Sequence, residues 1–341
     1  MIGAYYTGRH SVQLRPSPPV PPAAGQVQLR VRYVGLCGTD LHIFDGDLDN
    51  RVKAPQVFGH EMVGVIEALG DGVQGWKPGE LVTVRPLRTC GVCAACRRGF
   101  ENVCYRLDVL GVDSPGALQT LWTVPAANLH RLPAGRAPEQ CALVEPMAVA
   151  CHDIRMAELN PGDFVVVLGG GPIGLLIALI ARLKGARVLL SEPNANRLRL
   201  AQDLGLDSVD PRTGSLPDVV AARTNGEGAD VVFEVSGHPQ AAQVMTEIVR
   251  ARGRIVIVSI FAQPPQVNLQ RFFARELFMC GARVYQPQDF EEAIGLLAAG
   301  QLVLEPMVSR IIAMDEISPA FEAMRQGEVM KVLVDVAASG A

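Results

Sequence analysis

The sequence lacks any concentration of positive charge. Its 341 residues contain 31 Lys and Arg against 35 Asp and Glu, which gives a formal net charge of −4. The basic residues are scattered along the chain, whereas a nucleic-acid partner would need a basic stripe to meet its phosphates. The composition therefore argues against nucleic-acid binding.

Long hydrophobic runs are also missing. No uninterrupted apolar stretch approaches the ~20 residues that a membrane helix needs, so we expect no membrane partner. The first residues, MIGAYYTGRHSVQL, alternate like a strand and lack the basic-then-apolar order of a signal peptide. We therefore expect a cytoplasmic protein. The chain has no internal repeat and no low-complexity tract beyond the proline-rich connector RPSPPVPPAAG.

The sequence does contain enough apolar material for two cores. Hydrophobic residues make up 49% of a chain that is too long for one comfortable core. Up to about residue 148, short β runs such as VQLRVRYVGL and ELVTVRP are separated by Gly and Pro. This pattern is typical of a compact β-barrel or sandwich, and we assign residues 1–148 to it.

From about Asp163 the pattern changes. An apolar strand, FVVVLG, leads into a glycine-rich turn and an apolar helix, and further strand-like runs then alternate with helix-length segments. Such alternation predicts a parallel sheet that helices cover on both faces. The predicted fold class is therefore α/β, with a doubly wound domain over residues 149–286. From its residues alone, the tail 287–341 could belong to either domain.

Four of the eight cysteines lie in one short loop, TCGVCAACRRGFENVC. Their spacing suits a tetrahedral zinc ion, and a closed shell of four thiolates would leave no position for a substrate. A reducing compartment favours metal ligands over disulfides. A disulfide pair, buried free thiols or an iron–sulfur cluster are the alternatives. The expected ligands of this structural zinc are Cys90, Cys93, Cys96 and Cys104.

A second set of possible metal ligands is spread over the first domain. Cys37 in GLCGTDLHIF offers a soft donor, and His60 and Glu61 in FGHEMVG offer an intermediate and a hard one, which suits zinc. Glu145 in CALVEPMAVACH has apolar neighbours, and a buried carboxylate needs a cation or partner. A catalytic zinc has three protein ligands and one open position, so Cys37 and His60 with Glu61 or Glu145 could form such a site. Taken alone, each could also be a core or turn residue.

Thr39 and His42 lie two and five residues past Cys37. A hydroxyl near the metal could pass a proton from an alcohol towards an imidazole that reaches solvent, and histidine titrates near neutrality. The simpler interpretation is a threonine in a turn and a histidine on the surface.

The glycine-rich turn GGGPIG connects an apolar strand to a helix. Gly169 allows the tight turn, Gly171 lets the backbone approach a pyrophosphate, and Gly174 lets helix and strand pack closely. Glu192 ends the next strand, where a carboxylate binds ribose hydroxyls and repels the extra phosphate of NADP. Arg197 could stack near the adenine or attract that phosphate. The turn predicts NAD binding, and a purely structural turn is the alternative.

Together and in this order, these features resemble the zinc-dependent medium-chain dehydrogenases over almost the whole chain. The resemblance implies a GroES-like barrel over residues 1–148, joined by residues 287–341, and a Rossmann domain over residues 149–286. It also implies two zinc ions per chain, one catalytic and one structural, and a homotetramer or homodimer. The activity that it implies is hydride transfer between a secondary alcohol and NAD, with zinc as Lewis acid.

Within this family the pattern is most similar to the polyol, butanediol and threonine dehydrogenases, in which a Glu of an EP segment replaces a cysteine ligand. Glu145 matches that Glu, so the resemblance assigns the catalytic zinc to Cys37, His60 and Glu145. Glu61 would bind directly or through water, and Thr39 and His42 would relay the proton. The cofactor contacts that the resemblance implies are Gly169, Gly171, Pro172, Ile173, Gly174, Glu192, Arg197, Ser259 and the backbone of Ala282–Val284.

Two departures from the family pattern bear on the substrate. Polyol and butanediol members often carry a Glu before the Pro of the strand that leads to the cysteine loop, whereas VRPLRTC has Arg85. Threonine dehydrogenases carry a His shortly before the first loop cysteine, whereas this chain has Leu87. We therefore hypothesise a polyol, vicinal diol or sugar acid as substrate. Arg85 or Arg88 could meet a carboxylate, although a surface salt bridge is the commoner role of an arginine.

Two kinds of alternative remain. An L-threonine 3-dehydrogenase or a simple-alcohol dehydrogenase would belong to the same class of enzyme. A non-catalytic, NAD-sensing zinc protein would belong to another class, and it would not need Cys37, His60 and Glu145 together.

Overall fold

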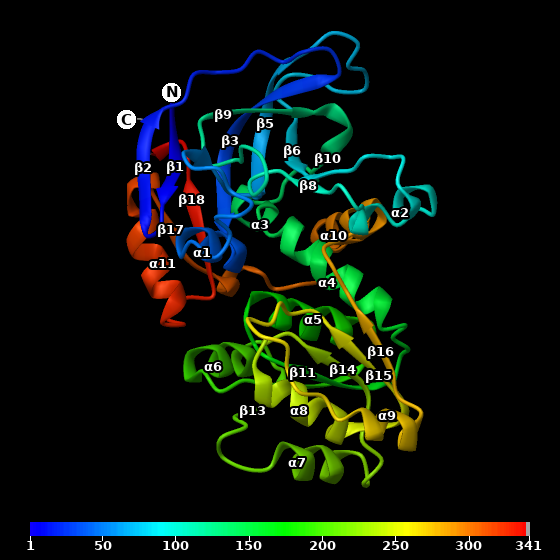
Figure 1. Cartoon of the computed structure of the whole chain (residues 1–341). Coiled ribbons are helices and arrows are strands. Elements are labelled where there is room, and N and C mark those ends of the chain that lie inside the picture. The colour runs from blue at the N-terminus through cyan, green and yellow to red at the C-terminus, as the bar shows by residue number, and fades with distance from the viewer. Residues whose placement is uncertain (339–341) are drawn as a thin grey trace. The chain divides into compact units, whose positions relative to one another are not determined.

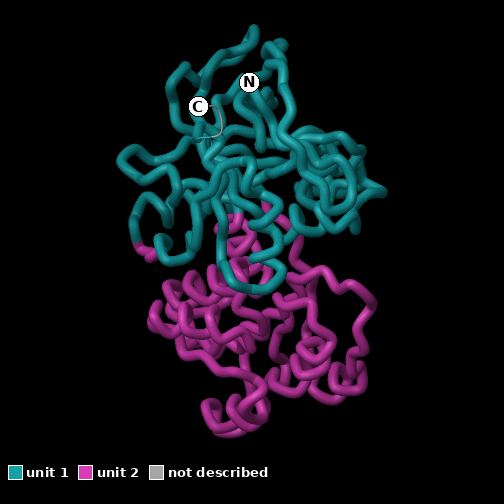
Figure 2. The backbone as a smooth tube through the Cα atoms, turned by 90° about the vertical axis from the view of Figure 1, so that its left-hand side faces the viewer, with its two compact units in different colours: residues 1–145, 286–300, 304–341 teal, residues 146–285, 301–303 magenta. Residues whose placement is uncertain are grey.

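The computed structural model describes residues 1–338, which form two compact units (Figure 2). Unit 1 contains Met1–Glu145, Gln286–Gly300 and residues 304–338, and unit 2 contains Pro146–Tyr285 and Gln301–Val303. Helix α4 (Val144–Met156) contains the first boundary between them. None of the described helices is both long enough and apolar enough to span a membrane.

Unit 1 is built on a mostly antiparallel seven-stranded sheet (Figure 1). In hydrogen-bonding order the strands are β10 (Leu129–Arg131), β6 (Leu81–Val84), β5 (Glu61–Leu69), β3 (Gln26–Leu36), β18 (Lys331–Asp335) and β17 (Val308–Ile312), and β9 (Leu121–Pro125) also pairs with β3. The pairing of β3 with β5 sets Gly35 opposite Glu61, and that of β18 with β3 sets Val332 opposite Leu36. The C-terminal tail therefore supplies two strands of this sheet.

Smaller elements surround that sheet. A three-stranded sheet, β2-β1-β4, and a two-stranded pair, β7-β8, complete the β structure of unit 1. Their bounds are β1 (Ile2–Gly8), β2 (Ser11–Pro16), β4 (Gln56–Val57), β7 (Leu87–Arg88) and β8 (Asp108–Val109). The helices are α1 (Gly38–Phe44), α2 (Ala94–Arg97), α3 (Pro138–Cys141), α10 (Pro287–Ala299) and α11 (Ile317–Arg325), with 3₁₀ turns η1 (Glu101–Val103), η2 (Ala126–Asn128), η3 (Glu305–Met307) and η4 (Met314–Glu316).

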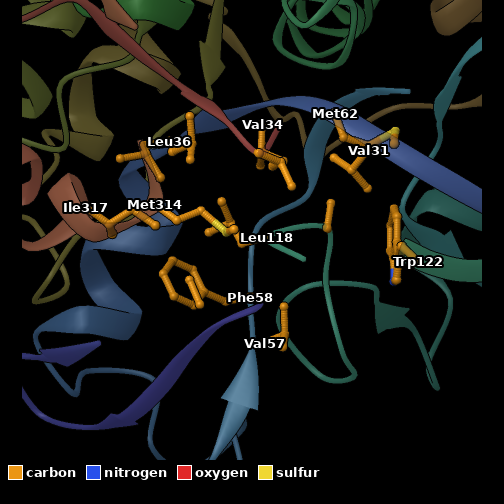
Figure 3. Close-up of a cluster of buried hydrophobic side chains, with 14 of the residues drawn as sticks. Val31, Val34, Leu36, Val57, Phe58, Met62, Leu118, Trp122, Met314 and Ile317 are labelled. Atoms are coloured by element: carbon orange, nitrogen blue, oxygen red, sulfur yellow. The ribbon is translucent and has the colours of Figure 1, made fainter. Parts of the chain in front are cut away.

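The core of unit 1 draws on both ends of the chain. In Figure 3, Val34 of β3 and Phe58 lie in the same buried cluster as Ile317 of α11. Phe321 of α11 is fully buried and stacks on Phe44 of α1, with ring centroids 4.8 Å apart. Burying such side chains contributes about 1.5–3 kcal/mol each to folding. The barrel is therefore complete only when the C-terminal segment has packed onto it.

Unit 2 is a parallel sheet of six strands (Figure 1). The strand order is β13 (Asp207–Val209), β12 (Arg187–Ser191), β11 (Phe164–Leu168), β14 (Ala229–Glu234), β15 (Val249–Ile257) and β16 (Phe278–Gly281). Along the chain this is the order 3-2-1-4-5-6, in which ligands bind where the order reverses, between β11 and β14. The predicted α/β fold class, a GroES-like barrel with a Rossmann domain, is confirmed. The short strand β13 has too few apolar residues to be predicted from sequence.

Helices connect these strands. They are α5 (Pro172–Leu183), α6 (Ala195–Asp203), α7 (Leu216–Arg223), α8 (Pro239–Ile248) and α9 (Leu269–Arg275), after α4 at the start of the unit. Helix α5 begins with Pro172. Proline lacks a backbone N–H, but at the first position of a helix this group would make no intrahelical hydrogen bond. Its residues 174–181 are all buried, which fits a helix that is apolar all round.

Candidate metal and cofactor sites

The four cysteines of the loop at residues 90–104 form one compact cluster of free thiols. The Sγ–Sγ distances are 3.5 Å for Cys93–Cys96 and Cys90–Cys104, 3.9 Å for Cys93–Cys104 and 4.0 Å for Cys90–Cys96. A disulfide would require about 2.05 Å. A regular tetrahedron with metal–sulfur bonds of ~2.3 Å has edges of ~3.8 Å. The thiols therefore fit a tetrahedral metal ion, as the spacing predicted.

The backbone of the loop supports thiolates. Gly91 and Gly99 take the left-handed conformation, with φ of 68° and 78°, which lets the chain wrap around the sulfurs. Backbone N–H groups, first that of Val92 and then that of Cys93, lower the pKa of Cys90 to about 6. Burial and neighbouring thiols raise the pKa of Cys96 to about 12. With its raised pKa, Cys96 would keep its proton near neutral pH, and a divalent cation would favour its thiolate form.

A second group of metal-ligating donors lies at the end of the central sheet of unit 1. Donor atoms of Cys37, His60 and Glu61 all lie within 4.8 Å of one another. Cys37 follows β3, Glu61 begins β5 and His60 directly precedes it, so the pairing of these two strands brings the donors together. His60 and Glu61 are buried and Cys37 is partly buried. A sulfur, an imidazole and a carboxylate at this separation fit a zinc ion with an open position.

Asp40 orients this group, and our sequence reasoning missed it. It is fully buried, and its Oδ2 accepts a hydrogen bond of 2.8 Å from the backbone N–H of Cys37. Its Oδ1 lies 3.4 Å from Nδ1 of His60, and neither atom has a hydrogen-bond partner among residues 1–338. A carboxylate behind Nδ1 leaves Nε2 of the ring for the metal. The sequence CGTD gave little indication that Asp40 orients His60, because an Asp in the first turn of a helix usually serves only to cap the helix N-terminus.

Asp40 also affects the charge of His60. Burial lowers the pKa of His60, but the negative charge and hydrogen bond of Asp40, with a contribution from Cys37, outweigh it and raise the pKa well above its ordinary value. In the absence of a metal, the ring therefore keeps a proton that a metal ion would displace.

Lys331 is the second residue that sequence reasoning missed. Its Nζ lies 2.8 and 2.7 Å from the two carboxylate oxygens of Glu61 and donates to the carbonyl oxygen of Leu36 at 3.1 Å. Both charged side chains are buried. Burial lowers the pKa of Lys331, but Glu61 and Cys37 outweigh it and raise it, so the ammonium stays charged. A single Lys before an apolar run gave no sign of this pairing 270 residues away.

Glu145 lies in the first turn of α4 and is buried. It is not one of the three described residues whose donor atoms lie within 4.8 Å of one another. Its negative charge helps to raise the pKa of Lys331, after Glu61 and Cys37, so it acts on the same cluster. Its role as a zinc ligand stays a prediction.

The two residues predicted to relay a proton share one helix. Thr39 and His42 stand three residues apart on α1, and residues at this spacing lie on the same helix face. Thr39 is partly buried, whereas the His42 side chain is 59% exposed and its Nδ1 lies 2.9 Å from Oδ2 of Asp47. Their role as a proton relay stays a prediction.

Two glycines of the glycine-rich turn in unit 2, Gly169 and Gly174, do not tolerate a side chain. Gly169 has φ of 109°, and a Cβ on Gly174 would lie 1.9 Å from the carbonyl oxygen of Gly169. The turn opens on a cavity of about 720 Å³ that includes Gly171, Glu192 and Arg197 in its lining. The free N–H groups at the start of α5 make this end of the helix suitable for a pyrophosphate.

Glu192 and Arg197 face this cavity in different states. Glu192 is buried, and its Oε2 and Oε1 each accept a 2.6 Å hydrogen bond, from the backbone N–H of Gly170 and Asn194. It therefore braces the turn and still keeps lone pairs for hydroxyl groups. The Nε of Arg197 is buried and has no hydrogen-bond partner among the described residues. A guanidinium in this state suits an adenine face or a phosphate.

Ser259 follows β15, and its hydroxyl donates to the buried carboxylate of Glu234. The same carboxylate accepts hydrogen bonds from the backbone N–H groups of Ser236 and Gly237. Glu234 thus connects the segment that follows β14 to the segment that follows β15. The predicted approach of Ser259, Pro172, Ile173 and Ala282–Val284 to a dinucleotide stays a prediction.

We expect Cys93→Ser to remove one of two zinc ions per chain, because a hydroxyl replaces one thiolate of the tetrahedral cluster. The thermal midpoint should fall by roughly 5 °C or more, since a structural zinc contributes folding free energy. Elemental analysis and a thermal melt would measure both. Cys280→Ser is the control, because this thiol lies outside the cluster and contacts the carbonyl of Met156. Retention of two zinc ions by Cys93→Ser would contradict the assignment.

We expect Gly174→Ala to weaken dinucleotide binding by at least roughly tenfold, about 1.4 kcal/mol. The added methyl group would displace the carbonyl of Gly169 and distort the turn. Quenching of protein fluorescence by NADH would measure the dissociation constant. The matched control is Gly295→Ala in α10, where a Cβ meets no atom within 4 Å and should stabilise the helix. Equal affinities for both variants would argue against this binding site.

Comparisons with known proteins agree with this architecture. Residues 23–134 match the model of the alcohol dehydrogenase GroES-like domain, and residues 172–299 match that of the zinc-binding dehydrogenases. The chain is 48% identical to a 2-dehydro-3-deoxy-L-galactonate 5-dehydrogenase from Pseudoalteromonas atlantica, over 98% of both chains. It is 35% identical to a sorbitol dehydrogenase from Halalkalibacterium halodurans, over 96% of both.

A solved structure shares the whole fold. A putative zinc-binding dehydrogenase from Sinorhizobium meliloti, bound to NADP, superimposes with a TM-score of 0.91 at 30% identity, over 98% of both chains. The expected resemblance is therefore confirmed, and the chain belongs to the zinc-binding alcohol dehydrogenase family.

Proposed function

We propose that this alcohol dehydrogenase oxidises a secondary hydroxyl of a polyhydroxy compound, a polyol or a sugar acid, with NAD as hydride acceptor. The observation that carries the proposal is the meeting of Cys37, His60 and Glu61 within 4.8 Å at the end of one sheet. The relatives support the substrate class, since one is named for a sugar acid and another for sorbitol.

The residues around the proposed zinc site control its charge and geometry. Asp40 fixes the ring of His60, and Lys331 neutralises Glu61. A zinc ion held here would supply Lewis-acid polarisation of the substrate hydroxyl. Because Lys331 offsets one of the two negative charges, the site would keep more positive charge for the substrate oxygen than Cys37 and Glu61 alone would allow.

Thr39 and His42 would carry the proton away from the substrate hydroxyl. The Thr39 hydroxyl can accept a proton on one side and donate its own on the other. His42 would pass the proton to solvent, and its Asp47 partner would stabilise the imidazolium that forms.

The cavity beside the glycine-rich turn would hold the dinucleotide. NAD is proposed over NADP because the buried carboxylate of Glu192 would repel a 2′-phosphate, although the Sinorhizobium meliloti neighbour is bound to NADP. One catalytic and one structural zinc per chain fit the two clusters of donors. We also propose a cytoplasmic homotetramer or homodimer, on the resemblance to the family and on a thiol cluster that suits a reducing compartment.

A substrate panel tests the proposed function. The zinc-loaded protein should reduce NAD faster than NADP with sorbitol, galactitol or L-galactonate, and it should not turn over L-threonine. Absorbance of the reduced nicotinamide gives the rates. Turnover confined to threonine or ethanol would support the alternative dehydrogenases. Two bound zinc ions without turnover of any alcohol would support the non-catalytic sensor.

Thr39→Val should lower kcat by roughly 100-fold, the size of a typical general acid–base contribution, because valine keeps the shape and removes the hydroxyl. The bound zinc should stay at two ions per chain. Thr39→Ser is the matched control, since it restores the hydroxyl and should recover most of the activity. A valine variant as active as the parent would exclude this relay.

A further inference from the structure

Arg85 is a charged residue whose side chain has no hydrogen bond or ion pair with any described residue. It follows β6, is half-buried, and its Nε and Nη1 are fully buried without a hydrogen bond to any described residue. A buried donor on a charged group is unfavourable unless another group pairs with it. The unsatisfied donors therefore indicate a ligand that the protein chain itself does not provide.

The backbone around Arg85 is held firmly. Its N–H donates to the carbonyl of Asn128 at 2.8 Å, and the side-chain amide of Asn128 donates back to the carbonyl of Arg85 at 2.6 Å. The N–H of Leu87 donates to the same carbonyl at 2.8 Å. The lack of side-chain partners is thus not the result of a loose loop, because this position is fixed from both sides.

Strand pairing sets Arg85 at the same end of the sheet as the metal ligands. β5 and β6 pair with Gly64 opposite Val82, and the hydroxyl of Thr83 donates to the carbonyl of Met62 at 2.7 Å. Because β6 (Leu81–Val84) runs antiparallel to β5 (Glu61–Leu69), Arg85, which follows β6, lies toward the end of the sheet at which Glu61 begins β5.

A second connection leads to His60. The carbonyl of Pro86 accepts a 2.9 Å hydrogen bond from the N–H of Leu110. The next residue, Gly111, packs so closely that a Cβ on it would lie 3.2 Å from the Cβ of His60. The segment that follows Arg85 is therefore connected, through Leu110 and Gly111, to the residue that precedes β5.

Nearby charged groups do not neutralise Arg85. Arg88, the other arginine considered from the sequence, pairs with Asp108, and Glu291 bonds to Nδ1 of His130 at 2.6 Å. Burial lowers the pKa of His130, the bond to Glu291 opposes this, and the positive charge of Arg85 lowers it further. The guanidinium of Arg85 therefore adds positive charge near His130, and Arg88 and Glu291 each have another partner.

We propose that Arg85 binds the carboxylate of a sugar-acid substrate and makes the enzyme prefer an aldonate to the alditol of the same carbon skeleton. A guanidinium can donate two parallel hydrogen bonds to a carboxylate, which fixes the orientation of the chain that carries the reacting hydroxyl. This inference rests on the proposed function. It agrees with the sugar-acid name of the relative that is 48% identical.

The test compares L-galactonate with galactitol, which differ by a carboxylate in place of a terminal hydroxymethyl group. For Arg85→Met, we expect kcat/KM to fall on the order of 100-fold with L-galactonate and less than about threefold with galactitol, since a desolvated charge pair is lost only with the acid. For Arg85→Lys, the loss of kcat/KM with L-galactonate should be intermediate, because lysine keeps the positive charge but lacks the two parallel N–H donors of a guanidinium. Arg88→Met is the matched control and should leave both values unchanged.

A binding measurement makes the test independent of turnover. Titration of L-galactonate into the zinc-loaded protein with NADH should show weaker binding to Arg85→Met than to the parent. The thermal midpoint of the free variant should not fall, because no salt bridge is lost. If Arg85→Met does not fold, Arg85→Lys tests the inference instead, through its kcat/KM relative to the parent with L-galactonate and with galactitol.

Several results would overturn the inference. They are an equal loss with both substrates, unchanged binding of L-galactonate by the variants, or a parent enzyme that prefers galactitol. Failure of the proposed function looks different, since the parent would then turn over neither compound. In that case the binding titration still decides whether Arg85 holds a carboxylate.

Discussion

The proposed metal site of unit 1 depends on one buried ion pair, between Lys331 and Glu61. Its partners come from strands that are 270 residues apart in the chain. Two charges of opposite sign in an apolar interior are tolerable only in good geometry, and removing one of them typically destabilises a protein by about 3–5 kcal/mol. The two oxygens of Glu61 and a backbone carbonyl satisfy all three donors of Lys331. The last strand of the barrel therefore helps to hold a residue beside the proposed metal.

The same pair changes what Glu61 can do. A carboxylate bound to an ammonium is a weaker ligand than a free one, because its charge is already compensated. Asp40 has the complementary role, since it adds negative charge behind His60 and strengthens the imidazole as a donor. Whether Glu61 contacts the metal thus depends on whether its carboxylate binds Lys331 or the metal cation more strongly. This balance is a property of the cluster and not of any one ligand.

Local features of the fold and sites could be predicted from the residues themselves, whereas long-range ones were either implied by the family resemblance, as the joining of residues 287–341 to the barrel was, or missed. The strand–turn–helix at Gly169–Gly174 and the cysteine cluster depend on spacings within a few residues, which the sequence displays directly. Asp40 and Lys331 look ordinary in their segments, because an Asp in a first helical turn and a Lys at a strand end are common. Only the pairing of β3 with β5 and β18 reveals their partners. A single sequence motif does not determine the register of a sheet.

The unpaired arginines point to the places that ligands would fill. Among residues 1–338, the guanidinium nitrogens that are buried without a hydrogen bond belong to Arg85 in unit 1 and Arg197 in unit 2. Other arginines that contact a carboxylate, such as Arg51 with Asp113 and Arg250 with Asp230, are already paired. Arg197 lines the cavity of the glycine-rich turn, where an anionic dinucleotide would compensate it. The same reasoning applies to Arg85. If this fold pairs its other buried charges, the anion that compensates Arg85 would be the carboxylate of the substrate.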